Sequence, residues 1–343
     1  MKKRTLKLAV LSLMMTAMLF NCKDKDKDPD APDSGIIKDL DKVNIAPITV
    51  DAPAAVKATE AKVEASAKAT EVNGALDGIA ASGTVPASVS SAAADVSGAI
   101  SASEVSTLNS VSSETVAAVA AGGALSPELK TLVDKAMANP ALAAYLPKFT
   151  LPVVEGVTLK GTREAGAEGV EKVEGIQATD ACIDAANAAF DVVKTRLDAS
   201  KATEAAKVDA AYLTWIAPIA PAQTACTDGL TPKYAAFRTA AQQTAAAAIA
   251  DLDAAQGVLG NLYPVLKALV NIQLLGVLSS INTLEAADKQ ACIAKATAAK
   301  SLADAAKTAN LAKVNAAYTT ALAEATKLKT AALASCHNQG GGN

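Results

Sequence analysis

Histidine and aromatic residues are scarce in this chain. His337 is the only histidine, Trp215 is the single tryptophan, and aromatic residues make up 3% of the sequence. His337 stands in a tail that ends Gln339-Gly340-Gly341-Gly342-Asn343, a setting in which a histidine is usually solvated. A Ser-His-Asp or Cys-His catalytic site would have to be built from that tail. The composition therefore argues against enzymes that depend on histidine.

Motifs for catalysis and for cofactor binding are also missing. The sequence has neither a G-x-x-x-x-G-K-[ST] run nor an H-E-x-x-H run, and the glycines between residues 161 and 169 lack the spacing of a phosphate loop. Asp251 and Asp253 are two residues apart, so on a helix they do not face each other. Glu168 and Glu171 are typical of a solvated helix face. We therefore expect no enzyme activity, no cofactor and no metal site.

Clustered positive charge is absent as well. The chain has 32 basic and 35 acidic residues. Residues 1–21 carry four basic residues and no acidic one, so the remainder has 28 basic against 35 acidic residues, a net charge of about −7. Binding to the phosphates of nucleic acid needs clustered Lys and Arg, and no such cluster occurs in this remainder. We expect no nucleic-acid partner.

The N-terminus has the pattern of an export signal. Residues 1–7 carry four basic side chains, an apolar stretch follows from Leu8 to Phe20, and the segment closes with Leu19-Phe20-Asn21-Cys22. The apolar stretch is shorter than the roughly 20 residues of a transmembrane helix, and no stop-transfer pattern follows it. Residues 1–21 are therefore predicted to be a cleaved signal peptide.

The end of this segment resembles the lipobox of bacterial lipoproteins, in the relaxed form found in spirochaetes, where residues such as Asn21 precede the cysteine. The resemblance implies that Cys22 begins the mature chain and carries a diacylglyceryl group and an N-terminal acyl chain such as palmitate. It places the protein in the cell envelope. Lys23 does not resemble the acidic inner-membrane retention signal, which favours the outer membrane. An ordinary secretory signal with a chance cysteine is the alternative.

Residues 22–51 are predicted to be a lipid-anchored tether. Lys and Asp alternate from Lys23 to Asp28, Pro29 follows, and no apolar side chain in this run needs burial. Such a run stays extended and solvated, and it would hold a folded domain away from the bilayer. A binding role for the charge run is the alternative.

Alanine dominates the rest of the chain, and because alanine is the best helix former, the fold class is predicted to be all-α. Residues 52–160 are predicted to form an Ala/Ser/Val-rich, low-complexity region of short helices, with a loop from Pro147 to about Gly161. Capping and turn residues predict short helices in this region. They cover residues 52–72, 88–94, 103–121 and 140–146, and a further helix begins at residue 127. The clearest starts are Ser126-Pro127-Glu128 and Asn139-Pro140.

Residues 161–337 are predicted to form an elongated antiparallel bundle of long Ala-rich helices, and residues 338–343 a flexible tail. The spacing of proline and glycine predicts breaks at Pro218 and Pro221 and helices over residues 177–216, 232–260, 262–281 and 284–336. A helix over residues 284–336 would be about 80 Å long, and it can bury its apolar face only against other helices.

Two of these helices contain a near-repeat. Residues 206–212 (AKVDAAY) nearly match residues 312–318 (AKVNAAY). Duplication of a helix and chance similarity between Ala-rich sequences both explain such a match. In either case Tyr212 and Tyr318 are expected to pack their rings between helices.

Four cysteines follow Cys22, at positions 182, 226, 292 and 336. An even number of cysteines in an exported protein predicts disulfide bonds, whereas zinc would need a C-x₂-C type of spacing that no pair has. Both Cys182 and Cys226, and Cys292 and Cys336, are 44 residues apart, which is compatible with two separately closed hairpins. Each interval spans one long helix, however, so an up-down bundle favours Cys182–Cys336 and Cys226–Cys292.

Together these patterns predict a membrane-anchored, non-enzymatic lipoprotein that presents a helical bundle for binding or for envelope organisation. The expected partners are the membrane, through acylated Cys22, and a protein or host ligand of unspecified kind. The alternative is a membrane-active helical protein that hides the apolar helix at residues 258–281. Asn261, Lys267 and Asn271 interrupt that helix and favour a buried helix of the bundle.

Overall fold

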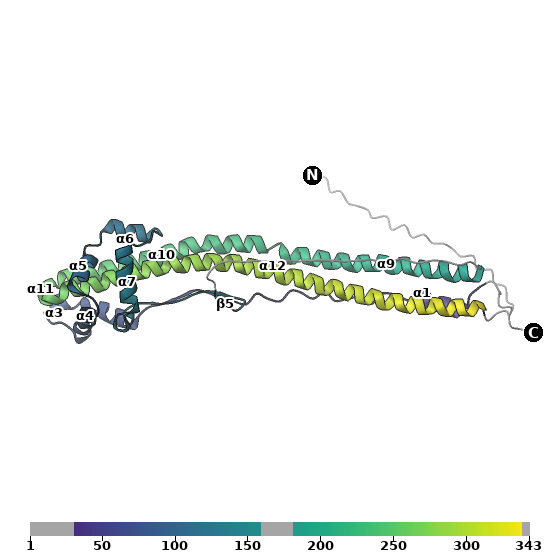
Figure 1. Cartoon of the computed structure of the whole chain (residues 1–343), viewed down its shortest axis with the longest axis horizontal. Helices are drawn as coiled ribbons and strands as arrows, with labels where there is room; N and C mark the ends of the chain where they lie inside the picture. The colour runs from purple at the N-terminus through teal and green to yellow at the C-terminus, as the bar shows by residue number, and fades with distance from the viewer. Residues whose placement is uncertain (1–30, 159–180, 338–343) are drawn as a thin grey trace, which may run out of the picture. The chain divides into compact units, whose positions relative to one another are not determined.

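The computed structural model describes residues 31–158 and 181–337, which form an all-α fold with a few short strands (Figure 1). The predicted fold class is confirmed. The helices are α1 Ser34–Lys42, α2 Ala67–Leu76, α3 Ile79–Ser82, α4 Ala87–Ala99, α5 Ala102–Asn109, α6 Ser113–Ala120, α7 Pro127–Ala138, α8 Pro140–Ala143, α9 Ala181–Ile216, α10 Ile219–Ala254, α11 Gln256–Leu259 and α12 Tyr263–His337, with a 3-10 turn, η1, at Gly260–Leu262. The strands are β1 Ala58–Thr59, β2 Lys62–Glu64, β3 Lys148–Thr150, β4 Val153–Val154 and β5 Val157–Thr158.

The chain divides into two compact units. Of the described residues, the first contains 31–46, 181–201 and 317–337, and the second contains 47–158 and 202–316. The predicted signal peptide, the lipobox with Cys22 and the predicted tail at residues 338–343 lie outside the described residues.

The first unit packs α1 against the start of α9 and the end of α12. The carboxylate of Asp33 caps α1 by accepting a hydrogen bond from the backbone N–H of Gly35 at 2.7 Å. The core of this unit consists of Leu40, Ile45, Val193, Leu197, Ala321 and Ala325. The predicted tether at residues 22–51 therefore contains a helix, which is a correction. Leu40 is buried in this core and holds α1 against α9 and α12.

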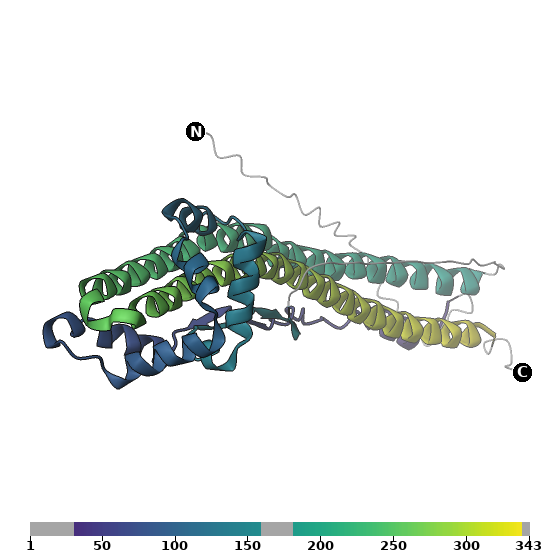
Figure 2. The ribbon, with the colours of Figure 1, turned by 60° about the vertical axis from the view of Figure 1, so that its left-hand side comes forward.

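In the second unit, α10 and the first part of α12 lie side by side and run in opposite directions (Figure 1). They are joined through α11 and η1. Gly260 has φ 52° and ψ −119°, a backbone conformation that glycine adopts without a steric penalty. This turn lies at the end of the predicted helix over residues 232–260. The short helices α2–α8 gather around it (Figure 2) and form the main core with α10–α12.

The short helices begin where capping residues predict. Ser126 Oγ accepts a hydrogen bond from Leu129 N at 3.3 Å at the start of α7, and Asn139 caps α8 in the same way at 2.9 Å. The predicted helix over residues 103–121 is two helices, α5 and α6, because Ser112 Oγ accepts from Thr115 N at 3.2 Å and starts a new one. Local capping chemistry therefore places most of these helix starts.

Residues 52–72 do not form the predicted helix. β1 pairs with β4, β4 with β5, and β2 with β3, all antiparallel, so the predicted loop from residue 147 also contains strands. Val63 lies opposite Phe149, and both pack against a core that contains Leu230 and Tyr234. Strand pairing with a distant segment decides this structure, and no local pattern signals the partner. The helix α2 begins only after Ser66 caps it.

The long helices have fewer breaks than the sequence predicts. A helix start is expected near Pro232, whereas α10 begins at Ile219 and runs through Pro232. Pro221 lies in the first turn of α10, where a missing N–H costs little. The two helices expected over residues 262–281 and 284–336 form the single helix α12. Packing against opposing helices stabilises α10 by more than the roughly 3 kcal/mol that an interior proline such as Pro232 costs, and it also carries α12 through residues 282–283.

The near-repeat places one tyrosine against an opposing helix in each unit. Tyr212 OH donates to Asp304 Oδ1 at 2.6 Å in the second unit, and Tyr318 OH donates to Asp198 Oδ1 at 2.6 Å in the first. The lysine three residues after each aspartate lies over the tyrosine ring, with Nζ 4.8 Å and 4.7 Å from the centroids. The lysine four residues before each aspartate, together with the tyrosine hydroxyl, holds the pKa of that aspartate below its ordinary value. The repeat therefore makes the same inter-helix contact in both units.

Candidate binding region along α10 and α12

The apolar segment at residues 258–281 is buried in the second unit. Leu266, Ile272, Leu275 and Leu278 are each at most 2% exposed, and they pack against the short helices. Among the described residues, one stretch, Gln256–Cys336, is long and apolar enough to cross a membrane, and 61% of its apolar window is buried in the fold. The short helices thus cover the segment on which the membrane-active alternative depends.

Polar side chains that interrupt or follow this segment hold the covering helices in place. Asn271 Nδ2 donates to Leu108 O at 3.0 Å, and Asn282 Nδ2 donates to Val119 O at 3.0 Å. These carbonyls belong to the last turns of α5 and α6, and each also accepts from a backbone N–H just beyond its helix, Leu108 O from Val111 N at 3.4 Å and Val119 O from Gly122 N at 3.0 Å. Asn271 within the apolar run and Asn282 just after it therefore tie the ends of two covering helices to α12, a role that the sequence pattern did not predict.

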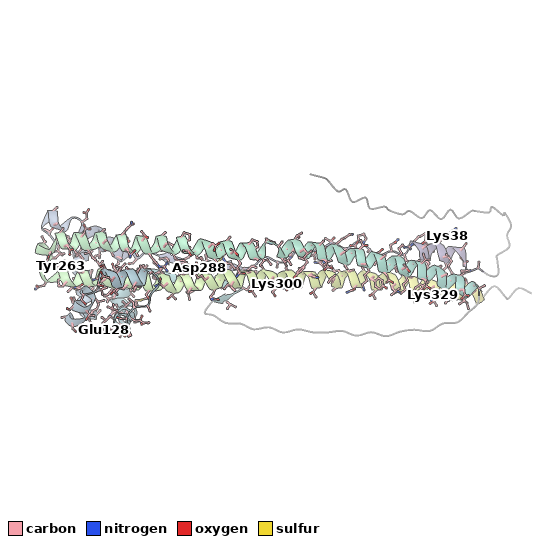
Figure 3. The ribbon with its side chains drawn as sticks, turned by 90° about the horizontal axis from the view of Figure 1, so that it is seen from above. Lys38, Glu128, Tyr263, Asp288, Lys300 and Lys329 are labelled. Atoms are coloured by element: carbon pink, nitrogen blue, oxygen red, sulfur yellow. A yellow bond between two sulfur atoms is a disulfide. The ribbon has the colours of Figure 1, made fainter. Side chains whose placement is uncertain are left out.

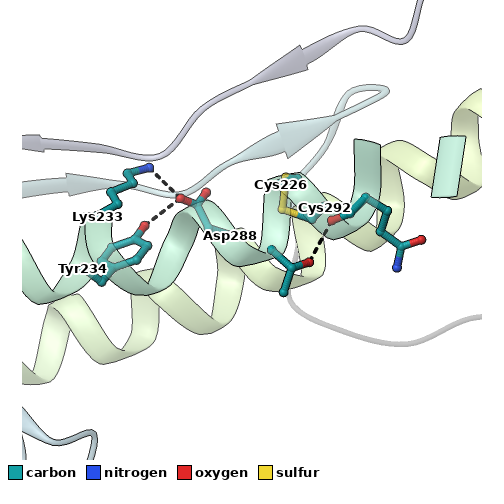
Figure 4. The surroundings of a disulfide bond; sticks show 7 residues. Cys226, Lys233, Tyr234, Asp288 and Cys292 are labelled. Atoms are coloured by element: carbon teal, nitrogen blue, oxygen red, sulfur yellow. Dashed lines mark hydrogen bonds and ion pairs between the residues drawn. A yellow bond between two sulfur atoms is a disulfide. The ribbon is translucent and has the colours of Figure 1, made fainter. Parts of the chain in front are cut away.

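A buried carboxylate joins α10 to α12 one turn before Cys292. Asp288 is 6% exposed, and its Oδ2 accepts hydrogen bonds from Tyr234 OH at 2.7 Å and from Lys233 Nζ at 2.8 Å (Figure 4). Along α12, Asp288 lies between Tyr263 and Lys300 (Figure 3). Burying a charge is costly unless it is paired and hydrogen-bonded, and both conditions hold here. Sequence reasoning missed this group because its partners lie far away along the chain.

Arg238 continues the polar network along the same two helices. Its guanidinium pairs with Glu285 and donates to Asn282 Oδ1 at 2.8 Å, and Lys289 Nζ lies 2.7 Å from Glu285 Oε1. Burial raises the pKa of Glu285, but the bonds from Lys289 and Arg238 outweigh it and hold the pKa below its ordinary value. Burial and the bond to the aspartate raise the pKa of Tyr234. Neither group exchanges a proton near neutral pH, so the network fits a structural role better than acid–base catalysis.

A hollow of about 330 Å³ lies among β2, α2, α10 and α12. Its lining includes Val63, Ala69, Phe237, Leu274 and Val277, and none of its lining residues is charged. The volume is at the lower end of the range for small-molecule sites. This hollow would suit a small apolar ligand, because it offers no charged group to orient a polar one.

Glu104 is expected to make the stability of the short-helix region depend on acid pH. Its carboxylate accepts bonds from Lys135 Nζ and from Ser101 N, each at 2.7 Å, and these bonds lower its pKa from 4.5 to about 2. A carboxylate with a lowered pKa in the folded state stabilises the fold above pH 4.5, and this contribution is lost as the pH falls toward 2.

We therefore expect the melting temperature to fall as the pH decreases from 4.5 toward 2, and to fall less steeply in Glu104→Gln. Thermal unfolding followed by circular dichroism over this range checks the prediction. Glu71→Gln, an exposed residue of α2, is the matched control and should keep the wild-type slope. Equal slopes in wild type and Glu104→Gln would contradict the assignment.

The four cysteines at positions 182–336 form the pairing that the helix-end argument favours. Cys182 and Cys336 are bonded in the first unit, and Cys226 and Cys292 in the second, with Cα atoms 5.8 Å apart in each pair (Figure 4 shows the second). Within the described residues, no group of three or more His, Cys, Asp or Glu side chains is placed to hold a metal ion. The predicted lipidation site, Cys22, lies outside the described residues.

Comparison of the chain with protein-family models, with curated proteins and with solved structures found no match. What the protein does therefore has to be inferred from its own residues and geometry.

Proposed function

We propose that the protein is a lipid-anchored, non-enzymatic protein of the cell envelope that presents its helical bundle for binding or for envelope organisation. The observation that carries the proposal is the pair of inter-helix disulfides, because disulfides form and persist in exported compartments. The leader at residues 1–21 points to the same destination, and Cys22 directly after it supplies the anchor. Lys23 after the lipobox favours the outer membrane.

The geometry of the described residues supports binding rather than catalysis. The buried charges of the Asp288 network are matched within it and hold α10 to α12. The hollow among β2, α2, α10 and α12, and a second one beside Cys226 and Cys292, are lined mainly by apolar side chains, whereas an enzyme that uses two carboxylates needs both of them in one cleft. Hydrolysis of a broad substrate panel by the purified protein would contradict this part of the proposal.

Replacing Cys22 by alanine tests the anchor directly. Cells that express the wild-type chain should incorporate labelled palmitate into the protein, and the protein should enter the detergent phase on phase separation. Cys22→Ala should lose the label and move to the aqueous phase, because stable anchoring needs at least two membrane-binding signals such as acyl chains. The Cys182→Ala/Cys336→Ala variant, which removes other thiols, is the matched control and should keep the label. A labelled Cys22→Ala protein would overturn the assignment.

Protease treatment of intact and lysed cells then separates the two versions of the proposal. Loss of the protein from intact cells would place the bundle on the outer surface and favour adhesion or binding of a host ligand. Protection until lysis would place it in the periplasm and favour an envelope scaffold, whose partners crosslinking can identify.

The membrane-active alternative rests on the apolar helix that is long enough to span a bilayer. Because the short helices bury this helix, we expect no dye release from liposomes at micromolar concentrations of Cys22→Ala protein without lipid. Dye release under these conditions would favour the alternative over the bundle-presenting role.

A further inference from the structure

A groove in the second unit lies beside the Cys226–Cys292 disulfide, where the end of α9, the start of α10, α12 and residues 56–58 at the start of β1 contribute side chains. Its volume is about 510 Å³, which is within the range of small-molecule sites. Trp215 from α9 and Ile219 from α10 supply the bulky apolar part of the lining. The polar network around Asp288 does not include any lining residue of the groove.

Small side chains keep this space open. Ala222 on α10 and Ala296 and Ala299 on α12 line the groove, so no bulky side chain from these positions fills it. The disulfide holds the Cα atoms of Cys226 and Cys292 5.8 Å apart and fixes the helix separation at one end of the groove. The hollow is therefore a preformed feature of the helix pair, and a ligand would not have to pay for opening it.

Three hydrogen-bond donors line the groove, and none of their side chains has a partner among the described residues. They are the indole N–H of Trp215, the amide of Gln223 and the ammonium of Lys295. Lys295 is half-buried and unpaired, whereas Lys289 and Lys300 on the same helix each lie 2.7 Å from a carboxylate. No acidic residue lines the groove. A partly buried ammonium without a counter-charge favours an anion, and a charge-assisted hydrogen bond to a carboxylate is strong.

We propose that this groove binds a small amphipathic carboxylate with a single alkyl chain, such as a free fatty acid. The carboxylate pairs with Lys295, and the alkyl chain lies along the alanine surface and Trp215. Apolar walls with a few placed polar donors are the usual composition of a site for such a ligand. This inference rests on the proposed binding role and names the ligand class for it.

The single tryptophan of the chain provides the measurement, because Trp215 lines the groove and no other tryptophan contributes to the emission. The protein is the full chain with Cys22→Ser, so that no acyl chain of its own competes. Titration with dodecanoate below its micelle concentration should change the Trp215 emission saturably. Lys295→Met should bind dodecanoate about tenfold more weakly, since it loses one hydrogen bond to a charged group. Its affinity for the uncharged dodecanol should stay at the wild-type value.

Two control variants separate the groove from nonspecific binding. Ala296→Leu fills the groove and should abolish binding of both dodecanoate and dodecanol, with an unchanged circular dichroism spectrum. Lys327→Met removes an exposed lysine of α12 outside the groove and should bind like wild type. Vesicles of an anionic phospholipid should leave the emission unchanged, because the proposed ligand is the free carboxylate.

The proposal is wrong if dodecanoate gives no saturable change, if Lys295→Met binds it as tightly as wild type, or if only vesicles change the emission. These outcomes do not bear on the lipid anchor, because the protein used here lacks it. Conversely, loss of palmitate labelling at Cys22 would leave a measured dodecanoate affinity standing. The experiments therefore test the carboxylate site and the lipid anchor independently of each other.

Discussion

Replacing Leu275 by alanine is expected to lower the free energy of unfolding by about 3–5 kcal/mol. The Leu275 side chain is 0% exposed and packs with Leu129 and Val133 of α7, so its removal leaves a cavity between α12 and the short helices. Leu→Ala substitutions at buried sites lose both the transfer free energy of the removed atoms and the contacts around the cavity. Urea denaturation followed by circular dichroism measures the change.

Leu213→Ala is the matched control for this prediction. Leu213 lies on α9 in the second unit and is 62% exposed, so the same chemical change should alter stability by no more than about 0.5 kcal/mol. If the two variants are equally stable, the apolar segment is not packed under the short helices. That result would remove the main argument against the membrane-active alternative.

Removing either disulfide is expected to lower the free energy of unfolding by about 2–4 kcal/mol, because the unfolded chain regains the conformations that the crosslink excluded. The loops differ in length, with sequence separations of 154 residues for Cys182–Cys336 and 66 for Cys226–Cys292. In the chain-entropy description the longer loop contributes about 0.7 kcal/mol more. Double Cys→Ala variants of each pair, unfolded in urea, test both the size and the order of the effects.

Hydrogen exchange should localise the two effects, since each disulfide belongs to a different unit. Loss of Cys182–Cys336 should speed exchange at the start of α9 and the end of α12, and loss of Cys226–Cys292 should speed it along α10 near residue 226. Each variant is the control for the other. A Cys182–Cys226 peptide in a non-reducing digest of the wild-type protein would contradict the pairing itself.

The polar residues of the apolar segment show how far sequence reasoning reaches. Asn271 weakens the hydropathy of the segment and favours a buried bundle helix, and the structure buries the apolar residues on either side of it. Its bond to Leu108 O depends on where α5 ends in space, and periodicity carries no information about that. Asp288 is a similar case, because in sequence it cannot be told from an exposed acidic residue of the same helix such as Glu324. Its burial follows from the approach of Tyr234 and Lys233 on α10.

The sequence by itself determined the local features of the fold. Alanine content predicted helices, capping residues such as Ser126 and Asn139 predicted their starts, and cysteine positions along long helices favoured the observed pairing. These features depend on a few neighbouring residues or on the length of one helix, and their energies are local.

Only the tertiary structure decided the rest. Residues 58–59 and 62–64 form strands in place of an expected helix, α10 continues through Pro232, and two expected helices form the single helix α12. In each case contacts between segments far apart in the sequence outweigh propensities of at most a few kcal/mol. The groove beside Cys226 and Cys292 also appears only when α10 and α12 are placed side by side, because a hollow is the space that facing alanines fail to fill.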